Sequence, residues 1–450
     1  MEFRRIAVLN TGGSEARALA RKIRALQTLA VVENASERAP DAFFAGASGI
    51  VIVGNGPDAE AIGTALSSGL PVLALGSAAR AVLLRLGGEP GETLNENGTS
   101  GVRFFGNPLF EGLAQSERYL ARAEAWTLPP DCEAIAEGEG GWTAGFMRAD
   151  RRIFALQFGV ESNDPDGMQM LKNFLRNVCG LSEEWTMPAF LDDCVERLRA
   201  SCPDGTVVAA VSGGAPSVVA SALAARAFGG RLRCVLCDTG LFRKGERERI
   251  AREFTLETGL PLTTVDISEA VRESLLGVSD ESAKRAAVHR EILRALSREG
   301  GVVLRGAGRG GSFESLPLND LFREEILELG ERMGLSKALL SRQPFPESGL
   351  AGRVSGEVTE EKIAVLREAD AIFTGEIESA GLDKKLWQYY AALTGTVSGA
   401  YACVLHALVS QDAVTGYAFR LPYDLIERTV MRAMGDEARI EGVLYDVTGR

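Results

Sequence analysis

A glycine-rich turn between a predicted strand and a predicted helix is the part of this sequence best suited to chemistry. Residues 207–211 form a continuous β-branched and apolar run, which is typical of a strand buried on both faces of a parallel sheet. The hexapeptide Ser-Gly-Gly-Ala-Pro-Ser at 212–217 follows, and it leads into an Ala- and Leu-rich helix. Such a turn gathers backbone N–H groups at a helix N-terminus, where the helix dipole favours an anion. The pattern fits a phosphate site and a plain strand-to-helix connection equally well.

The scarcity of histidine limits the acid–base chemistry of this chain. The 450 residues include two histidines, His289 and His406, and neither lies near a candidate nucleophile in the sequence. Seven cysteines do not form a disulfide framework in a chain of this length, so we expect reduced thiols in a cytoplasmic protein. Cys234 and Cys237 have CxxC spacing, but on a buried strand they point to opposite faces, which favours core positions over a redox or zinc pair. No metal site is predicted.

Charge and hydropathy argue against two classes of partner. The formal net charge is −12, which disfavours a broad nucleic-acid footprint. No apolar run is long enough to span a bilayer, and residues 1–5 lead into a strand-like run rather than a signal-peptide core. We therefore expect neither a nucleic-acid partner nor a membrane partner.

The elements that position these residues alternate between strands and helices. Strand-like runs lie at 5–9, 49–53, 70–75, 207–211, 233–237, 261–266 and 301–306. Helical patterns separate them, as at 14–26, 59–68 and 78–86. This alternation is typical of doubly wound sheets with parallel strands. A helix expected at 360–380, followed by strands, indicates a smaller α+β region.

The glycine-rich turn resembles the pyrophosphate loop of the N-type ATP pyrophosphatases, Ser-Gly-Gly-x-Asp-Ser. The stretch Cys-Asp-Thr-Gly-Leu-Phe-Arg-Lys-Gly-Glu at 237–246 is similar to the next strand-end motif of glutamine-hydrolysing GMP synthases. The resemblance implies a nucleotide site at Ser212, Gly213, Gly214, Ser217 and Asp238. The family's loop Asp, which helps to hold magnesium and ATP, is replaced by Pro216. ATP and magnesium are thus candidate ligands that the substitution calls into question.

The N-terminal part resembles a class I glutamine amidotransferase. The matching stretches are Gly-Pro at 56–57, Pro-Val-Leu at 71–73, Asn-Pro-Leu-Phe at 107–110 and Gln-Phe-Gly-Val-Glu at 157–161. Enzymes of that family place a Cys nucleophile on a strained strand-to-helix turn and activate it with a His that a Glu orients. Carried over by position, the Cys falls on Gly76 and the His on Gly159, while Glu161 is retained. We therefore assign no catalytic residue to this part.

Other polar residues nearby do not replace the missing pair. Ser77 is a nucleophile in principle, but no base accompanies it. Asp164 and Asp166 are interpreted as members of a solvated loop. The family's Ser-His-Gly-Asp stretch, which faces glutamine, falls close to Ala-Arg-Ala-Glu at 121–124.

The resemblance covers essentially the whole chain and predicts three domains. They are an amidotransferase-like domain at 1–183, an ATP-pyrophosphatase-like (PP-loop) domain at 184–340 and a small dimerisation domain at 341–450. The fold class is therefore α/β, with two doubly wound α/β domains followed by a small α+β domain. The stretch Arg-Gln-Pro-Phe-Pro-Glu-Ser-Gly-Leu at 342–350 is one of the motifs behind the third domain. The resemblance also implies a homodimer.

The losses favour a GMP-synthase-like protein that is non-catalytic and acts as a binding, scaffold or regulatory protein. From the resemblance we expect two further losses, the family's lid loop after 306 and the tail that closes on xanthosine monophosphate. A missing nucleophile or base normally costs several orders of magnitude in rate. Two alternatives stay open. One is an ATP-dependent enzyme of purine biosynthesis that converts xanthosine monophosphate to GMP with free ammonia, and the other is a nucleotide or phosphate sensor.

Overall fold

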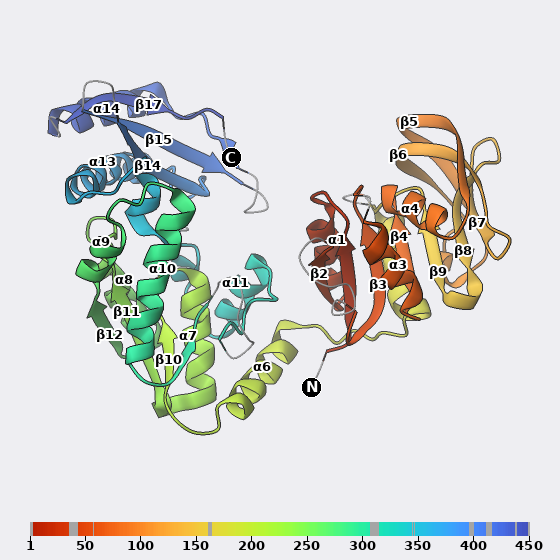
Figure 1. The fold of residues 1–450 in the computed structure, drawn as a ribbon, viewed down its shortest axis with the longest axis horizontal. Helices are drawn as coiled ribbons and strands as arrows, with labels where there is room; N and C mark the ends of the chain where they lie inside the picture. Colours follow the sequence, from red (N-terminus) through yellow and green to blue (C-terminus); the bar gives the residue numbers. More distant parts are fainter. Residues whose placement is uncertain are drawn as a thin grey trace. The chain divides into compact units, whose positions relative to one another are not determined.

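The chain divides into two compact units, Met1–Asp193 and Cys194–Arg450 (Figure 1). The structure is a computed structural model that describes residues 3–35, 44–56, 58–160, 164–306, 315–343, 345, 347–395, 400–410, 416–436 and 439–448. The boundary predicted at 340 lies inside the second unit, so the division into three domains stays a prediction. The predicted α/β fold class is confirmed.

The first unit is built on a nine-stranded mixed sheet with the strand order β2-β1-β3-β4-β9-β8-β7-β5-β6. Its parallel strands are β1 (Arg5–Asn10), β2 (Leu29–Asn34), β3 (Ala47–Val53), β4 (Val72–Leu75) and β9 (Ile153–Leu156). Its main helices are α1 (Glu15–Ala25), α3 (Ala59–Ser67), α4 (Ser77–Arg85) and α5 (Pro165–Asn173). Because β1 pairs with both β2 and β3, the strand order reverses beside β1. The carboxyl ends of strands at such a reversal are where α/β sheets bind ligands.

The other half of this sheet is antiparallel, which the sequence did not predict. It comprises β5 (Glu89–Phe104), β6 (Gln115–Thr127), β7 (Glu133–Gly138) and β8 (Thr143–Arg148). The β5 strand contains Pro, Asn and several Gly residues, which are depleted in strands. Its long antiparallel pairing with β6 therefore comes from tertiary context rather than from local propensity.

The second unit begins with the sheet that carries the glycine-rich turn. This four-stranded parallel sheet has the order β12-β11-β10-β13. The strands are β10 (Val207–Ala210), β11 (Leu232–Asp238), β12 (Leu262–Asp266) and β13 (Val302–Leu304). The helices around it are α6 (Met187–Ser201), which begins in the first unit, α7 (Ala215–Phe228), α8 (Glu246–Thr258), α9 (Ser268–Ser274), α10 (Glu281–Arg298), α11 (Arg323–Arg332) and α12 (Lys337–Leu340). All four strands lie where the sequence predicts strands.

A smaller α+β region completes the second unit. Its strands are β14 (Gln388–Gly395), β15 (Tyr401–Val409), β16 (Tyr417–Ala418) and β17 (Ile440–Tyr445), and its helices are α13 (Glu360–Ser379) and α14 (Tyr423–Asp436). One hydrophobic cluster includes Val208 of β10, Phe373 of α13 and Leu405 of β15. The two sheets of this unit therefore share a core. Within the described part of the chain, no helix combines the length and apolar character that a membrane span requires.

The carboxylate of Asp370 ties the two halves of the second unit together. Asp370 lies on α13 and is 1% exposed. Its Oδ1 accepts hydrogen bonds from Arg353 (3.2 Å) and from the backbone N–H of Ala391 on β14 (2.9 Å). Its Oδ2 lies 3.0 Å from Nε of Arg243, which follows β11. Burial lowers the pKa of Arg353 to about 10, although Asp370 opposes that shift. One buried anion thus holds two largely buried cations.

We predict that Asp370→Asn strongly destabilises the second unit. The substitution leaves two guanidinium groups in the interior without their anion, which typically costs about 3–5 kcal/mol. Glu368→Gln is the matched control, because Glu368 lies on the same helix and pairs with Lys244 at the surface. Urea denaturation of both variants measures the difference. Equal midpoints for the two variants would contradict this role for Asp370.

Candidate functional site

A pocket of about 430 Å³ opens at the carboxyl ends of β1, β3, β4 and β9 in the first unit. Its position coincides with the reversal of strand order beside β1, where ligand sites are expected. The lining residues include both positions at which the sequence predicted lost reacting groups, Gly76 and Gly159. The fold therefore brings these two residues to one cavity. The third residue of the predicted set, Glu161, lies outside the described residues.

Gly76 forms a strand-to-helix turn that keeps an unusual backbone conformation. Its φ is 58° and its ψ is −127°, and it directly precedes α4. Its N–H lies 2.9 Å from the carbonyl oxygen of Leu156 and 3.3 Å from that of Phe158. A Cβ at this position would meet no atom within 4 Å. The turn therefore has room for a side chain, yet it presents none.

The described part of the first unit supplies no thiol–imidazole pair to this pocket. No Cys or His is among the lining residues, and both histidines of the sequence lie in the second unit. Burial raises the pKa of Cys179 to about 12, which keeps that thiol protonated at neutral pH. Ser77 does line the pocket, as the first residue of α4. The pocket can therefore bind a molecule, but its described lining carries no activated nucleophile.

Two charged residues of the lining were missed in the sequence analysis. Glu15 and Lys22 both lie on α1 and both line the pocket. Nζ of Lys22 donates a hydrogen bond to the carbonyl oxygen of Val160, which is itself a lining residue. Their helix follows the first strand, so its position at a sheet edge could have been inferred. The side of the helix that faces the cavity could not have been inferred from the sequence.

The acidic stretch after β9 is not a solvated loop, contrary to our expectation. The Asp164 carboxylate accepts from the N–H of Gly167 at the start of α5, and it pairs with Arg118 of β6. Asp166 accepts from the hydroxyl of Ser116. The Arg118 side chain is 3% exposed, and its guanidinium lies over the rings of two phenylalanines. Because a buried guanidinium needs an anion, these acids are structural.

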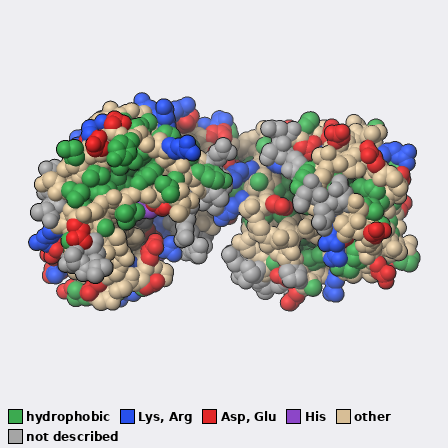
Figure 2. All heavy atoms as spheres, turned by 90° about the horizontal axis from the view of Figure 1, so that it is seen from above, with side chains coloured by type: hydrophobic (Ala, Val, Ile, Leu, Met, Phe, Trp, Pro, Cys, Tyr) green, Lys and Arg blue, Asp and Glu red, His purple; other side chains and the backbone are tan. Residues whose placement is uncertain are grey.

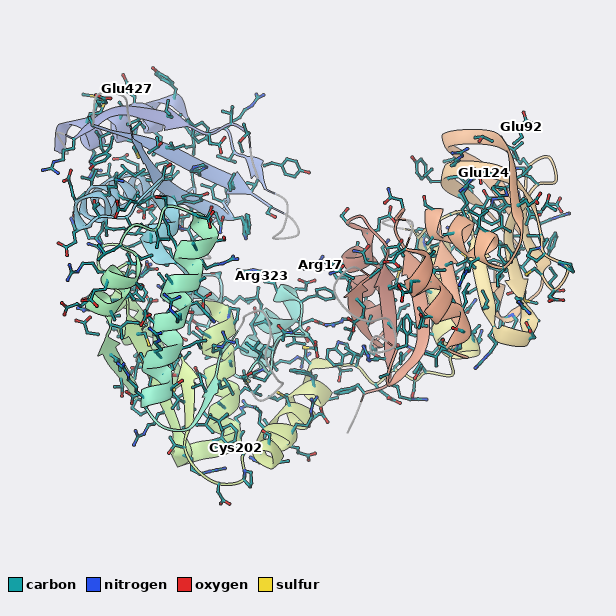
Figure 3. The ribbon with its side chains drawn as sticks, in the orientation of Figure 1. Arg17, Glu92, Glu124, Cys202, Arg323 and Glu427 are labelled. Carbon is teal, nitrogen blue, oxygen red and sulfur yellow. The ribbon has the colours of Figure 1, made fainter. Side chains whose placement is uncertain are left out.

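The stretch at 121–124 contributes one small residue to the pocket and one buried acid beside it. Ala121 lines the cavity. Glu124 of β6, labelled in Figure 3, is 2% exposed. Arg80 and Trp126 donate to its carboxylate, and Arg122 forms an ion pair with it. The amide of Gln157 bonds both backbone polar groups of Glu124 and so connects the end of β9 to β6. The Glu124 side chain therefore has a structural role, since its interactions stabilise this part of the sheet.

The glycine-rich turn at 211–214 lies between β10 and α7, as predicted. Gly213 has a φ of 79°, and a Cβ there would lie 2.6 Å from Cγ1 of Ile250, so only glycine fits. The Ser217 hydroxyl donates to the carbonyl oxygen of Gly214 (2.8 Å) and accepts from the N–H of Ser212 (3.2 Å). Ser217 is 6% exposed. Its hydroxyl is therefore already used within the turn.

Asp238 ends the neighbouring strand and is also engaged by the protein. Its Oδ1 accepts from the N–H of Gly240 (3.0 Å), and its Oδ2 lies 2.6 Å from a guanidinium nitrogen of Arg247. Arg342 reaches the same region, with NH1 3.4 Å from the carbonyl oxygen of Gly213. The two arginines were missed in the sequence analysis because they come from α8 and from the segment after α12. Nucleotide binding by the five predicted residues stays a prediction.

Two sequence comparisons with known proteins point to the same family. A model described as the GMP synthase C terminal domain matches residues 375–450. A glutamine-hydrolysing GMP synthase of Caldicellulosiruptor saccharolyticus is 30% identical over 505 aligned positions, which cover 100% of this chain and 98% of that protein. One from Mycobacterium tuberculosis is 31% identical and covers 99% of this chain and 96% of its own length. A solved glutamine amidotransferase from Thermotoga maritima aligns with a TM-score of 0.31 and 14% identity over 40% of this chain and 85% of its own.

We predict that Gly76→Ala destabilises the first unit even though the new methyl group has room. An L-residue held at this φ and ψ costs about 1–3 kcal/mol of backbone strain. Gly106→Ala is the control, since a Cβ there also meets nothing within 4 Å and no left-handed φ is required. Chemical denaturation should show a lower midpoint for the first variant alone. A neutral Gly76→Ala would mean that the turn relaxes out of its strained geometry.

Proposed function

The chain belongs to the family of glutamine-hydrolysing GMP synthases, and we propose that it is a non-catalytic member that acts as a binding, scaffold or regulatory protein. One observation carries the proposal. The pocket at the carboxyl ends of β1, β3, β4 and β9 has Gly76 and Gly159 in its lining, and neither Cys nor His is among the described residues that line it. The cavity and its strained turn are kept, while the groups that would attack an amide are lost.

The size of the loss supports a binding role over weak catalysis. Removing the nucleophile or the base of an acyl-transfer site costs about 10⁴-fold or more in rate. Here both positions carry glycine, and the retained Glu161 has no imidazole to orient. What survives such a loss is binding of a molecule without its conversion.

We predict no glutaminase activity above a blank for this protein. The pair Gly76→Cys with Gly159→His supplies a thiol on the strained turn and an imidazole in the same pocket, so we expect it to release ammonia from glutamine at a measurable rate. The pair Gly76→Ala with Gly159→His is the matched control, because it lacks only the thiol. Release of ammonia from glutamine by the unmodified protein would contradict the proposal.

A homodimer is part of the proposal. The residues matched by the GMP synthase C terminal domain include an exposed apolar set comprising Tyr417, Tyr423, Met431, Leu444 and Val447. Figure 2 shows hydrophobic side chains gathered on a face of the second unit. A contiguous apolar patch on the surface of a protein marks a site of association, and these five residues are our candidates for its members. Sedimentation equilibrium giving the mass of one chain would contradict the dimer.

A second candidate function belongs to the glycine-rich turn. Its strand–turn–helix form and the positive φ of Gly213 favour a site at which ATP with magnesium, or a simpler phosphate, binds at Ser212, Gly213, Gly214, Ser217 and Asp238. Pro216 removes one N–H and the family's acid from this site, and Arg247 already neutralises Asp238. The turn would then serve either an ammonia-dependent adenylylating enzyme or a nucleotide sensor.

We predict that, if this second function holds, ATP gives a magnesium-dependent heat of binding that Gly213→Ala abolishes. The added Cβ would press on Ile250 in a backbone region that disfavours L-residues. Gly230→Ala, at the other end of α7, is the control, since its Cβ meets nothing within 4 Å. Titration calorimetry without heat at any magnesium level removes this candidate. ATP–pyrophosphate exchange separates the enzyme from the sensor.

A further inference from the structure

A stack of side chains in the C-terminal sheet is centred on His406. Its imidazole belongs to β15 and stacks on the ring of Tyr390, which stands opposite it on β14 (Figure 1). The ring centroids are 4.6 Å apart and the ring planes differ by 17°. The guanidinium of Arg353, from the segment before α13, lies over the same tyrosine ring at 4.3 Å from its centroid. One neutral ring thus contacts both a cation and a histidine.

His406 also binds the segment that follows β17. Its Nδ1 lies 3.1 Å from Oδ2 of Asp446. Hydrogen bonds from Thr448 lower the pKa of Asp446, so this carboxylate is ionised and can only accept. We therefore assign the proton of the neutral imidazole to Nδ1, which leaves Nε2 as the atom that takes up a second proton. The N–H of Asp446 donates to the carbonyl oxygen of Leu405 at 3.0 Å, so the segment is attached beside the histidine.

The surroundings of His406 disfavour its charged form. Burial is the strongest influence and lowers the pKa of His406, Asp446 opposes that shift, and Arg353 reinforces it. Burial also raises the pKa of Tyr390, on which Glu281 of α10 acts in the same direction, so the phenol stays neutral. The His406 side chain is 18% exposed, so a proton can reach it from solvent.

A second proton changes the two contacts of the imidazole in opposite ways. It strengthens the bond to Asp446, because hydrogen bonds between charged groups are the stronger ones. It also places a second cation near Arg353, which is fixed, since Arg353 is 7% exposed and donates to the buried Asp370 at 3.2 Å. The imidazolium therefore gains by leaving the stack for water together with Asp446.

We propose that His406 is a pH-sensitive latch on the segment that follows β17. The neutral imidazole stacks on Tyr390 and holds Asp446, which fixes the segment against β15. The protonated imidazole leaves Tyr390 with Asp446 still bound, and the segment loosens. This device goes beyond the proposed function, because it needs neither a ligand nor a second chain.

Hydrogen exchange of residues 445–448 in the full chain, corrected for the intrinsic effect of pH on exchange, tests the proposal. We expect protection to be lost between about pH 8 and 5, the range in which histidine changes charge. The pKa of His406 is lower in the folded chain than in the unfolded chain, so the unfolded chain takes up the proton first. The stability that the neutral imidazole supplies is therefore complete above about pH 6.5 and is lost as the pH falls below it. Protection that stays constant over this range overturns the proposal.

Two histidine variants assign the effect to one side chain. His406→Gln should remove the pH dependence of protection, because an amide can donate to Asp446 but does not titrate in this range. His289→Gln is the matched control, since His289 is the other histidine of the sequence and pairs with a different carboxylate, that of Glu347. It should keep the pH dependence of the unmodified protein. The same response from both variants overturns the assignment to His406.

NMR spectroscopy keeps the proposal testable even if His406→Gln folds poorly. In the His289→Gln chain every imidazole signal belongs to His406, because the sequence has two histidines. We expect these signals to report a proton on Nδ1 at high pH and to titrate with the same midpoint as the loss of protection. A neutral imidazole protonated on Nε2 overturns the proposal, and so does a titration of His406 that leaves protection unchanged.

Discussion

The buried carboxylate of Asp370 is the constraint on which the second unit depends. A charge that is 1% exposed is tolerated only when its partners are fixed, and Asp370 receives two arginines and a backbone N–H. Those partners come from the loop after β11, from the segment before α13 and from β14. Because one anion needs all of them in place, the sheet that carries the glycine-rich turn and the C-terminal sheet are held as parts of one core. Hydrophobic packing alone would not specify this register.

A different constraint governs the first unit, where the backbone rather than a side chain maintains the site. The turn at Gly76 is held by bonds from its N–H to carbonyl groups at the end of β9. Such bonds do not depend on the residue type, so the geometry of a nucleophile turn can outlast the nucleophile. The carboxylates nearby that could act as an acid or a base form ion pairs with arginines instead. Asp164 pairs with Arg118, and Glu124 pairs with Arg80. Among the described lining residues of the resulting cavity, the charged ones are Glu15 and Lys22 of α1, and Lys22 is already bonded to Val160.

The two candidate sites therefore differ in what they leave open to a ligand. In the glycine-rich turn, the Ser217 hydroxyl and the Asp238 carboxylate already have protein partners, so an anion must compete with internal bonds. In the pocket of the first unit, Glu15 is exposed and unpaired among the described residues. This contrast concerns Glu15 alone, since Lys22 in the same lining donates to the carbonyl oxygen of Val160.

The sequence by itself determined the α/β class, the parallel strands β1, β3 and β4, and the four parallel strands of the sheet that carries the glycine-rich turn, because hydrophobic periodicity is a local property. The loss of reacting groups at Gly76 and Gly159 stays a prediction from residue identity. The sequence did not indicate the parallel strands β2 and β9. It did not reveal the antiparallel pairing of β5 with β6, whose glycines and asparagines favour turns. It also misassigned Asp164, whose partner Arg118 lies on a distant strand. Only the tertiary structure decided that Gly76, Gly159 and one face of α1 share a cavity. Those residues lie far apart along the chain, and their proximity depends on the order of strands in the sheet, which local pattern does not encode.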